Sequence, residues 1–224
     1  MARNNNFLTT PHRVPIEESN DWVTVVLLCE NAGHRMKSYG PTPLAKIGST
    51  TLIDLQIASI MRVIKNFELI ICGGFEAEKV IKHIRDKYKQ ISARFVENQI
   101  YNNSNSCESL RLCLNNTLND KILVCNGEII IQEHQNLCYG MPNKWCEVIF
   151  FNNSLIIEFT RKLVSNLEYK NKFIFEAIND ILKSKHKIKA VANKQKHILK
   201  LDNIKTYHQV RKTYARTDTR LLKP

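Results

Sequence analysis

Apolar runs alternate with polar gaps along the first 130 residues at a spacing that is typical of βαβ units. Continuous apolar runs at Val23–Leu28, Leu69–Cys72 and Lys121–Cys125 predict strands that are buried on both faces, as in a parallel sheet. Ile91–Val96 predicts a further strand. This alternation predicts an α/β fold: a doubly wound, mostly parallel, Rossmann-like sheet with helices on both faces.

Between these runs, apolar residues recur at helical spacing. The predicted helices in this part of the chain are Thr51–Phe67, Glu76–Tyr88 and Cys107–Leu118. From residue 147 onward the pattern predicts a strand, two helices, two short strands that can form a hairpin, and a last helix. These are Val148–Phe151, Ser154–Asn166, Phe173–Ser184, Ile188–Val191, His197–Leu201 and a helix from Ile204.

Three polar loops each follow a buried strand of the predicted sheet. They are Cys29–Pro43, Gly73–Phe75 and Asn126–Glu128. In doubly wound sheets, ligands bind beyond the carboxyl ends of the strands. We therefore expect these three loops to line one crevice.

The chain has 224 residues, which suits one α/β domain with short appendages. Pro11 and Pro15 oppose helix in the polar N-terminus, so residues 1–20 are interpreted as an extended arm. Residues 21–206 form the predicted domain, and residues 207–224 are predicted to be a peripheral basic tail.

The net charge of +12 is concentrated near the C-terminus, where residues 183–224 hold thirteen Lys or Arg and two Asp. Such a run is either a solvated tail or a surface for nucleic acid or another polyanion. No combined aromatic and basic recognition signature accompanies it.

Seven cysteines are present, the count is odd, and none are spaced as CxxC. This usage favours reduced, buried thiols over disulfides or a zinc site. No run approaches the roughly 20 apolar residues of a membrane span, and the polar N-terminus lacks a secretory h-region. We therefore expect a cytoplasmic protein.

One stretch resembles a known signature. The segment LLCENAGHRMKSYGPTPLAKIGSTTLID, Leu27–Asp54, is similar to that of sugar-phosphate and phosphocholine nucleotidyltransferases, which is roughly L-A-A-G-x-G-x-R-M, then P-K-P-L, then G-K-x-L-I. The positions retained are Leu28, Gly33, Arg35, Met36, Pro41, Pro43, Leu44, Leu52 and Ile53. Four later segments match that family in the same order: ICGGFEAEKV, VENQIYNNSNSCESL, VCNGEIII and LKLDNIKTYHQV.

The resemblance implies the fold of the nucleotide-diphospho-sugar transferases and a defined reaction. Such enzymes join an NTP to a small phosphorylated acceptor and release pyrophosphate. Glycines let backbone N–H groups approach the phosphates, cations neutralise the reacting groups, and two carboxylates hold Mg²⁺. The implied catalytic residues are Arg35 and Lys46, the implied nucleotide-binding residues are Leu28, Cys29, Glu30, Asn31, Gly33, Asn98, Asn103 and Ser109, and the implied metal ligands are Glu128 and Asp202.

Several signature positions are substituted in this chain. Asn31 replaces a glycine, Thr42 replaces the P-K lysine, and Thr50 replaces the G-K lysine. Losing one fixed donor to the reacting phosphates typically costs about 10²–10³ in rate, unless Lys37 or Lys46 takes its place. The alternative is a non-catalytic descendant that binds a nucleotide, a nucleic acid or a protein partner.

Each proposed site residue also has an ordinary structural interpretation. Arg35 can be an exposed loop arginine, and Gly33 can be a turn residue. Glu128 can be a solvated carboxylate at the end of a strand, and Asp202 can be the N-cap of the helix from Ile204.

Overall fold

The computed structural model describes residues 22–31, 36–117, 119–132, 147–184, 186 and 197–217. A five-stranded sheet forms its centre, in the order β5-β4-β1-β6-β8. The strands are β1 (Val23–Cys29), β4 (Phe67–Gly73), β5 (Ala93–Glu97), β6 (Ile122–Asn126) and β8 (Val148–Phe151). All neighbouring pairs are parallel except β6 and β8, which are antiparallel.

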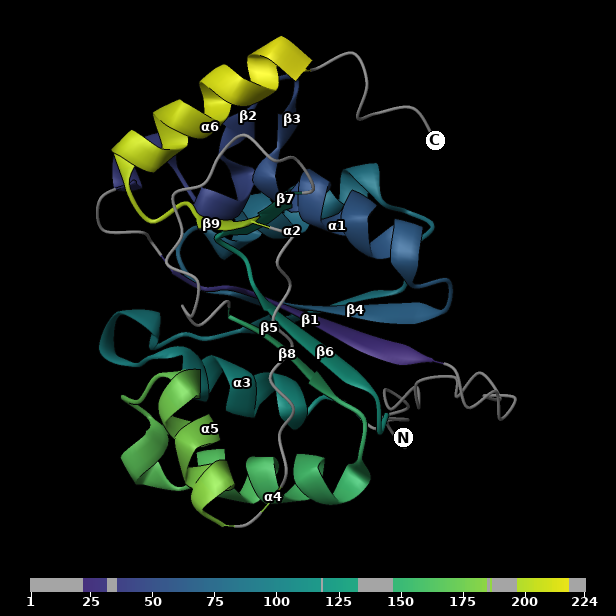
Figure 1. The fold of residues 1–224 in the computed structure, drawn as a ribbon, viewed down its shortest axis with the longest axis vertical. Helices are drawn as coiled ribbons and strands as arrows, with labels where there is room; N and C mark the ends of the chain where they lie inside the picture. Colours follow the sequence, from purple (N-terminus) through teal and green to yellow (C-terminus); the bar gives the residue numbers. More distant parts are fainter. Residues whose placement is uncertain are drawn as a thin grey trace, which may run out of the picture.

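Helices cover both faces of this sheet (Figure 1). On one face lie α1 (Leu52–Val63) and α2 (Ala77–Lys87), and on the other lie α3 (Ser106–Leu114), α4 (Ser154–Val164) and α5 (Ile174–Lys183). Alternate residues of β1 point to opposite faces: Val25 and Leu27 pack with α1 and α2, whereas Val26 and Leu28 pack with α3. The apolar runs are therefore continuous because both faces of each central strand are buried.

A third core cluster lies beyond α1, where two small sheets meet the last helix. The hairpin β2 (Lys46–Ile47) with β3 (Thr50–Thr51), and the pair β7 (Ile129–Gln132) with β9 (His197–Lys200), lie close to α6 (Ile204–Thr217) (Figure 1). The cluster includes Met36, Ile47, Leu52, Ile130, Leu201, Tyr207 and Val210. Short 3₁₀ turns at Lys37–Tyr39, Thr42–Leu44, Tyr101–Asn103 and Leu167–Tyr169 complete the described elements.

The doubly wound, mostly parallel sheet predicted from the apolar runs is confirmed. The peripheral-tail prediction is wrong for its first part, because Tyr207 and Val210 on α6 are 3% and 1% exposed and belong to the third core cluster. Residues 218–224 lie outside the described residues. The second short strand of the predicted hairpin pairs with β7, and its expected partner, Ile188–Val191, also lies outside the described part.

Five cysteines fall among the described residues, and all five are buried, as predicted: Cys29, Cys72, Cys107, Cys113 and Cys125. No helix in the described part of the chain has the length and apolar character needed to cross a membrane.

Candidate active site

Three strand-end turns meet at the carboxyl edge of the central sheet. The carbonyl of Glu30, after β1, accepts a hydrogen bond from the Phe75 N–H after β4 at 3.1 Å. The carbonyl of Leu28 accepts one from the Gly127 N–H after β6 at 2.7 Å. We expected these three loops to line one crevice. Their strand-end residues do meet through these backbone hydrogen bonds, but Gly73–Phe75 is not among the residues that line the cavity described below, and residues 32–35 lie outside the described residues.

Two of these turns need glycine because other backbone approaches them closely. A Cβ atom on Gly127 would lie 2.6 Å from the Cys29 Sγ and 2.8 Å from the Leu28 carbonyl oxygen. A Cβ atom on Gly74 would lie 2.5 Å from the Glu30 carbonyl oxygen and 2.9 Å from Tyr101. The glycines thus allow the three turns to pack against one another.

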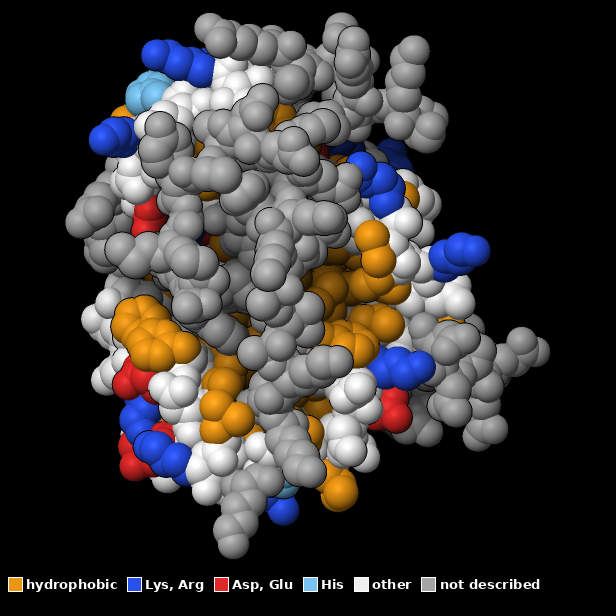
Figure 2. All heavy atoms as spheres, viewed as in Figure 1, with side chains coloured by type: hydrophobic (Ala, Val, Ile, Leu, Met, Phe, Trp, Pro, Cys, Tyr) orange, Lys and Arg blue, Asp and Glu red, His pale blue; other side chains and the backbone are white. Residues whose placement is uncertain are grey.

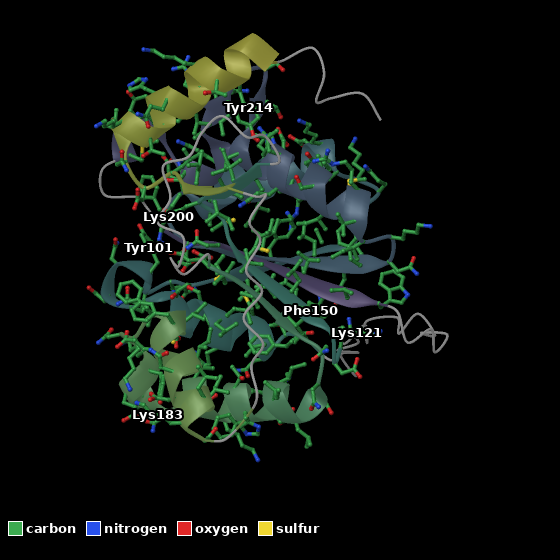
Figure 3. All side chains as sticks on the ribbon, viewed as in Figure 1. Tyr101, Lys121, Phe150, Lys183, Lys200 and Tyr214 are labelled. Atoms are coloured by element: carbon green, nitrogen blue, oxygen red, sulfur yellow. The ribbon has the colours of Figure 1, made fainter. Side chains whose placement is uncertain are left out.

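A cavity of about 260 Å³ opens beside these turns. Its lining combines apolar strand residues, three asparagines, one ion pair and two phenylalanines. The lining residues are Leu28, Asn31, Asn105, Ser106, Val124, Asn126, Glu147, Ile149, Phe173, Ile174, Phe175 and Lys200. The rings of Phe173 and Phe175 are stacked with centroids 5.6 Å apart. In Figure 3, Lys200 and Tyr101 lie at this end of the sheet, whereas Phe150 and Lys121 lie toward the opposite end.

Glu30 is a buried carboxyl group behind this cavity. It is 3% exposed, and its Oε2 has no hydrogen-bond partner among the described residues. Burial raises the pKa of Glu30 to about 7, against the opposing effect of hydrogen bonds from its own backbone and from the Ser109 hydroxyl. Asn98 Nδ2 donates to the Ser109 Oγ at 3.0 Å, so a buried polar chain runs from Asn98 through Ser109 to Glu30.

A cluster of charged groups lies where β7 pairs with β9. The Lys200 ammonium is 2.6 Å from Glu147 Oε1 and 3.9 Å from Glu128 Oε2. Burial raises the pKa of Glu128 to about 7, and although Lys200 lowers it, the carboxylates of Glu30, Glu147 and Asp202 raise it further. Burial lowers the pKa of Lys200, but the neighbouring carboxylates outweigh this effect and keep the ammonium charged.

The structure brings together only some of the residues predicted for the site. Leu28 and Asn31 line the cavity, Glu30 lies behind it, and the backbone of Cys29 lies against Gly127. Glu128 and Asp202 lie within electrostatic range of each other, with the Leu201 N–H donating to the Glu128 carbonyl at 2.7 Å.

Other predicted residues lie elsewhere or outside the described residues. Lys46 is exposed on β2 and is not among the residues that line the cavity. Asn103 is exposed in a 3₁₀ turn, and the side chains of Asn98 and Ser109 are engaged with each other. Gly33 and Arg35 fall outside the described residues. Nucleotide contacts by all of these residues stay predictions.

Sequence reasoning missed three features of the site. Lys200 belongs to a short strand whose partner, β7, lies about 70 positions earlier in the chain. Gln56 on α1 donates to the carbonyls of Asn126 and Ile129, both at 2.9 Å, and so supports the turn that carries Glu128. The Phe173–Phe175 pair brackets the start of α5 and was interpreted only as part of a helix.

The carboxylates implied for Mg²⁺ do not fit a metal ion in this arrangement. Magnesium requires direct oxygen ligands at about 2.1 Å, but the buried carboxylate of Glu128 faces the Lys200 ammonium. Asp202 is exposed. Among the described residues, no group of three or more His, Cys, Asp or Glu side chains is placed to hold a metal.

The sheet and its helices have the fold of two solved nucleotidyltransferase structures. The chain is similar to the structure of CTP:phosphocholine cytidylyltransferase from Streptococcus pneumoniae, with a TM-score of 0.67 and 17% identity over 85% of this chain and 98% of that chain. It is also similar to inositol-1-phosphate CTP transferase from T. maritima, with a TM-score of 0.62 and 11% identity over 85% of this chain and 95% of that chain.

At these identities the likeness establishes the fold. No match among curated proteins was found. The chain belongs to the family described as Domain of unknown function (DUF6564), whose model matches residues 48–221. The matched region begins just before β3 and extends beyond the end of α6, so the last helix belongs to the family domain.

Proposed function

We propose that this chain binds a nucleoside triphosphate at the carboxyl edge of its sheet and transfers the nucleoside monophosphate to a small phosphorylated acceptor. The observation that carries the proposal is the meeting of three strand-end turns beside a cavity at this edge. Ligands of open α/β sheets bind at such an edge. The similarity to two nucleotidyltransferase structures supports this class of reaction.

The reaction needs no protein nucleophile. An oxygen of the acceptor phosphate attacks the α-phosphorus of the NTP, the bond from that phosphorus to the bridging oxygen breaks, and pyrophosphate leaves with the electron pair. Cys29, the thiol within the turns, is unsuited to attack because it is buried, and burial raises the pKa of its thiol well above the usual value. The chain's contribution is to position both reactants and to neutralise their charge.

The cavity supports a particular class of acceptor. Phe173 and Phe175 are 49% and 44% exposed and present a stacked apolar face at its rim. An aromatic face attracts an alkylammonium group by a cation–π interaction. Phosphocholine, which carries such a group, therefore suits this rim better than a hydroxyl-rich sugar phosphate, and CTP is the first NTP to test, because both similar proteins are named for it.

A second candidate is a nucleotide-binding protein without transferase activity. Two observations favour it. Thr42 replaces the expected lysine, is 1% exposed, and has a hydroxyl with no hydrogen-bond partner among the residues that the structure describes. Glu128 faces an ammonium group. In this case the nucleotide would bind at the same edge but would remain intact. The basic segment suggested as a polyanion surface stays a prediction.

The deciding experiment incubates the protein with each NTP and phosphocholine, with and without MgCl₂. Pyrophosphate release and the mass of the coupled product are both measured. Transfer predicts equal amounts of pyrophosphate and product, whereas binding with neither product supports the second candidate. Absence of both binding and turnover would contradict both functions.

The acceptor assignment has its own test. Phe175→Ala should raise the KM for phosphocholine by about tenfold, which corresponds to about 1.4 kcal/mol, and should leave nucleotide affinity unchanged. Phe150→Ala is the matched control, because Phe150 is also exposed but lies toward the other end of the sheet (Figure 3). An equal KM for the two variants would show that the aromatic face of Phe173 and Phe175 is not part of the acceptor site.

A further inference from the structure

One lysine stands at the position where the fold implies a metal ion. The Lys200 ammonium lies 2.6 Å from Glu147 Oε1 and 3.9 Å from Glu128 Oε2, and its side chain is 32% exposed. Lys200 also lines the cavity, together with the amides of Asn31 and Asn126. The positive charge of Lys200 therefore lies beside two carboxylates and also borders the cavity in which a ligand would bind.

The backbone holds this lysine in place. β7 and β9 pair so that Ile129 lies opposite Lys200. On either side of that pair, the Leu201 N–H donates to the Glu128 carbonyl at 2.7 Å, and the Glu128 N–H donates to Asn126 Oδ1 at 2.7 Å. These backbone and turn hydrogen bonds therefore fix the main chain of Glu128 and of Lys200 next to each other. The Lys200 ammonium can move away from Glu128 only if its side chain rotates or if the strand pairing is broken.

The same geometry opposes a divalent cation at Glu128. A metal bound directly to the Glu128 carboxylate would lie within a few ångströms of the ammonium, and two positive charges at such a separation repel each other strongly when half-buried. A lysine is a compact point charge that binds phosphates. The ammonium can therefore supply positive charge to a phosphate in the cavity without a metal.

We propose that Lys200 takes the place of a divalent cation beside Glu128, so that the site accepts a nucleotide without magnesium. The claim that Lys200 excludes a metal ion is independent of the proposed function. The claim that the site accepts a nucleotide without magnesium rests on the proposed function. Lys200 is then the cation that contacts the nucleotide phosphates, and Glu128 and Glu147 hold it in position.

The metal part is tested with Mn²⁺ alone, measured by electron paramagnetic resonance of the free ion. The wild-type protein should bind no Mn²⁺ at Glu128, whereas Lys200→Gln should bind it at least about tenfold more tightly than wild type, because the repelling charge is gone. Lys162→Gln, which removes an exposed lysine on α4, is the control and should behave as wild type. Tight Mn²⁺ binding by wild type that Lys200→Gln leaves unchanged would overturn the proposal.

The nucleotide part is tested by titrating CTP into the protein in EDTA and in MgCl₂. Wild type should bind CTP with equal affinity in both buffers, and Lys200→Gln should lose about tenfold in EDTA. CTP binding by wild type that requires Mg²⁺ would overturn this inference and leave the proposed function intact. Failure to bind any NTP in either buffer would instead contradict the proposed function, while the Mn²⁺ result would still stand.

Removing Lys200 leaves two carboxylates without their cation, which can destabilise the fold. The double variant Lys200→Gln with Glu147→Gln removes both partners of the 2.6 Å pair and restores the balance of charge. This variant should fold as judged by circular dichroism and should still bind Mn²⁺ at Glu128 and Asp202. A folded double variant that binds no Mn²⁺ would show that the lysine is not what excludes the metal.

Discussion

At the scale of single residues, the site contains carboxyl groups that the fold keeps away from water. Glu30 is the clearest case, because it is 3% exposed and one of its carboxylate oxygens has no hydrogen-bond partner in the described part of the chain. The Ser109 hydroxyl donates a hydrogen bond to the carboxylate, and the positive charge of Lys200 also lowers its pKa. A buried group of this kind makes stability depend on pH in a range where exposed carboxylates do not titrate.

Glu30→Gln should flatten the dependence of stability on pH. The pKa of Glu30 rises from 4.5 to about 7 on folding, so the folded state binds the proton more tightly. The contribution of Glu30 to the free energy of unfolding is complete below about pH 4.5 and is lost as the pH rises to about 7. At about 1.4 kcal/mol per pKa unit, the difference is on the order of 3 kcal/mol.

Urea unfolding at pH 5, 6, 7 and 8 measures this effect. Wild type should lose stability across the series, and Glu30→Gln should lose clearly less. The remaining slope is expected from Glu128, whose pKa is also about 7. Glu97→Gln, which changes an exposed carboxylate at the end of β5, is the control. Parallel curves for wild type and Glu30→Gln would contradict the assigned pKa.

At the scale of elements, the sequence predicted the helices and strands that have a local pattern, and above all the strands that are buried on both faces. The runs Val23–Leu28 and Leu69–Cys72 are unambiguous because a central parallel strand has no polar face. The pairing of β7 with β9 was not predictable, because both strands are short and about 70 residues separate them. The burial of α6 was hidden for a related reason: its two fully buried residues, Tyr207 and Val210, lie among polar and basic residues, of which Lys205, Arg211 and Lys212 are exposed.

The same limit explains which site residues were found. The three turns follow strands that periodicity identified, so their meeting followed from topology alone. The ion pair of Lys200 with Glu147 depends on the β7–β9 pairing and had no signal of its own in the sequence. Local sequence patterns predict helices and strands and where they end. Contacts between residues far apart in the chain can be predicted only when the pairing register of the strands is known.

Asp54 joins α1 to α2 and should be a major determinant of stability. It is 5% exposed and accepts hydrogen bonds from Thr50, Thr51, His83 and Tyr88, with the Lys87 ammonium at 2.8 Å. Burial raises the pKa of Asp54, but the hydrogen bonds from Lys87, His83, Thr51 and Tyr88 outweigh it and hold the pKa well below the usual range. The stabilisation is therefore present above the ordinary pKa of 3.8 and is lost only as the pH falls through the lower folded-state value.

Asp54→Asn should lower the free energy of unfolding at pH 7 by about 2–4 kcal/mol, because it removes a charge that several buried donors share. Asp86→Asn, on the exposed face of α2, is the control and should change stability by less than about 0.5 kcal/mol. Denaturant unfolding of the two variants measures the difference. A similar small change in both would show that the hydrogen bonds to Asp54 add little.

Val210→Ala tests whether α6 is part of the core. Val210 is 1% exposed and packs in the third core cluster with Tyr207 and Leu201. Its truncation should cost about 1–3 kcal/mol in unfolding free energy. Gln209→Ala, at the neighbouring exposed position, should be nearly neutral. Equal stability of the two variants would show that α6 is a peripheral segment and not part of the core.

At the scale of the whole molecule, the charge and the site occupy different parts of the fold. On α6, the basic residues Lys205, Arg211 and Lys212 are exposed, and blue side chains stand at the upper left of the face in Figure 2. The cavity lies at the carboxyl edge of the central sheet, on the face covered by α3 and α5, which contribute Ser106, Ile174 and Phe175 to its lining. A ligand at the cavity and a polyanion on α6 would therefore be separate events that can be measured separately.

The central claim is that a nucleotide binds at the carboxyl edge of the sheet, and calorimetric titration of the four NTPs tests it most directly. Asn31→Trp places a bulky ring at the exposed rim of the cavity, and Asn152→Trp places one at an exposed position before α4 as the control. We predict that at least one NTP binds wild type and Asn152→Trp with a Kd of roughly 1 µM to 1 mM, and that Asn31→Trp loses this binding while remaining folded. Binding that is equal in all three proteins would place the nucleotide elsewhere, and no binding of any NTP to wild type would contradict the account.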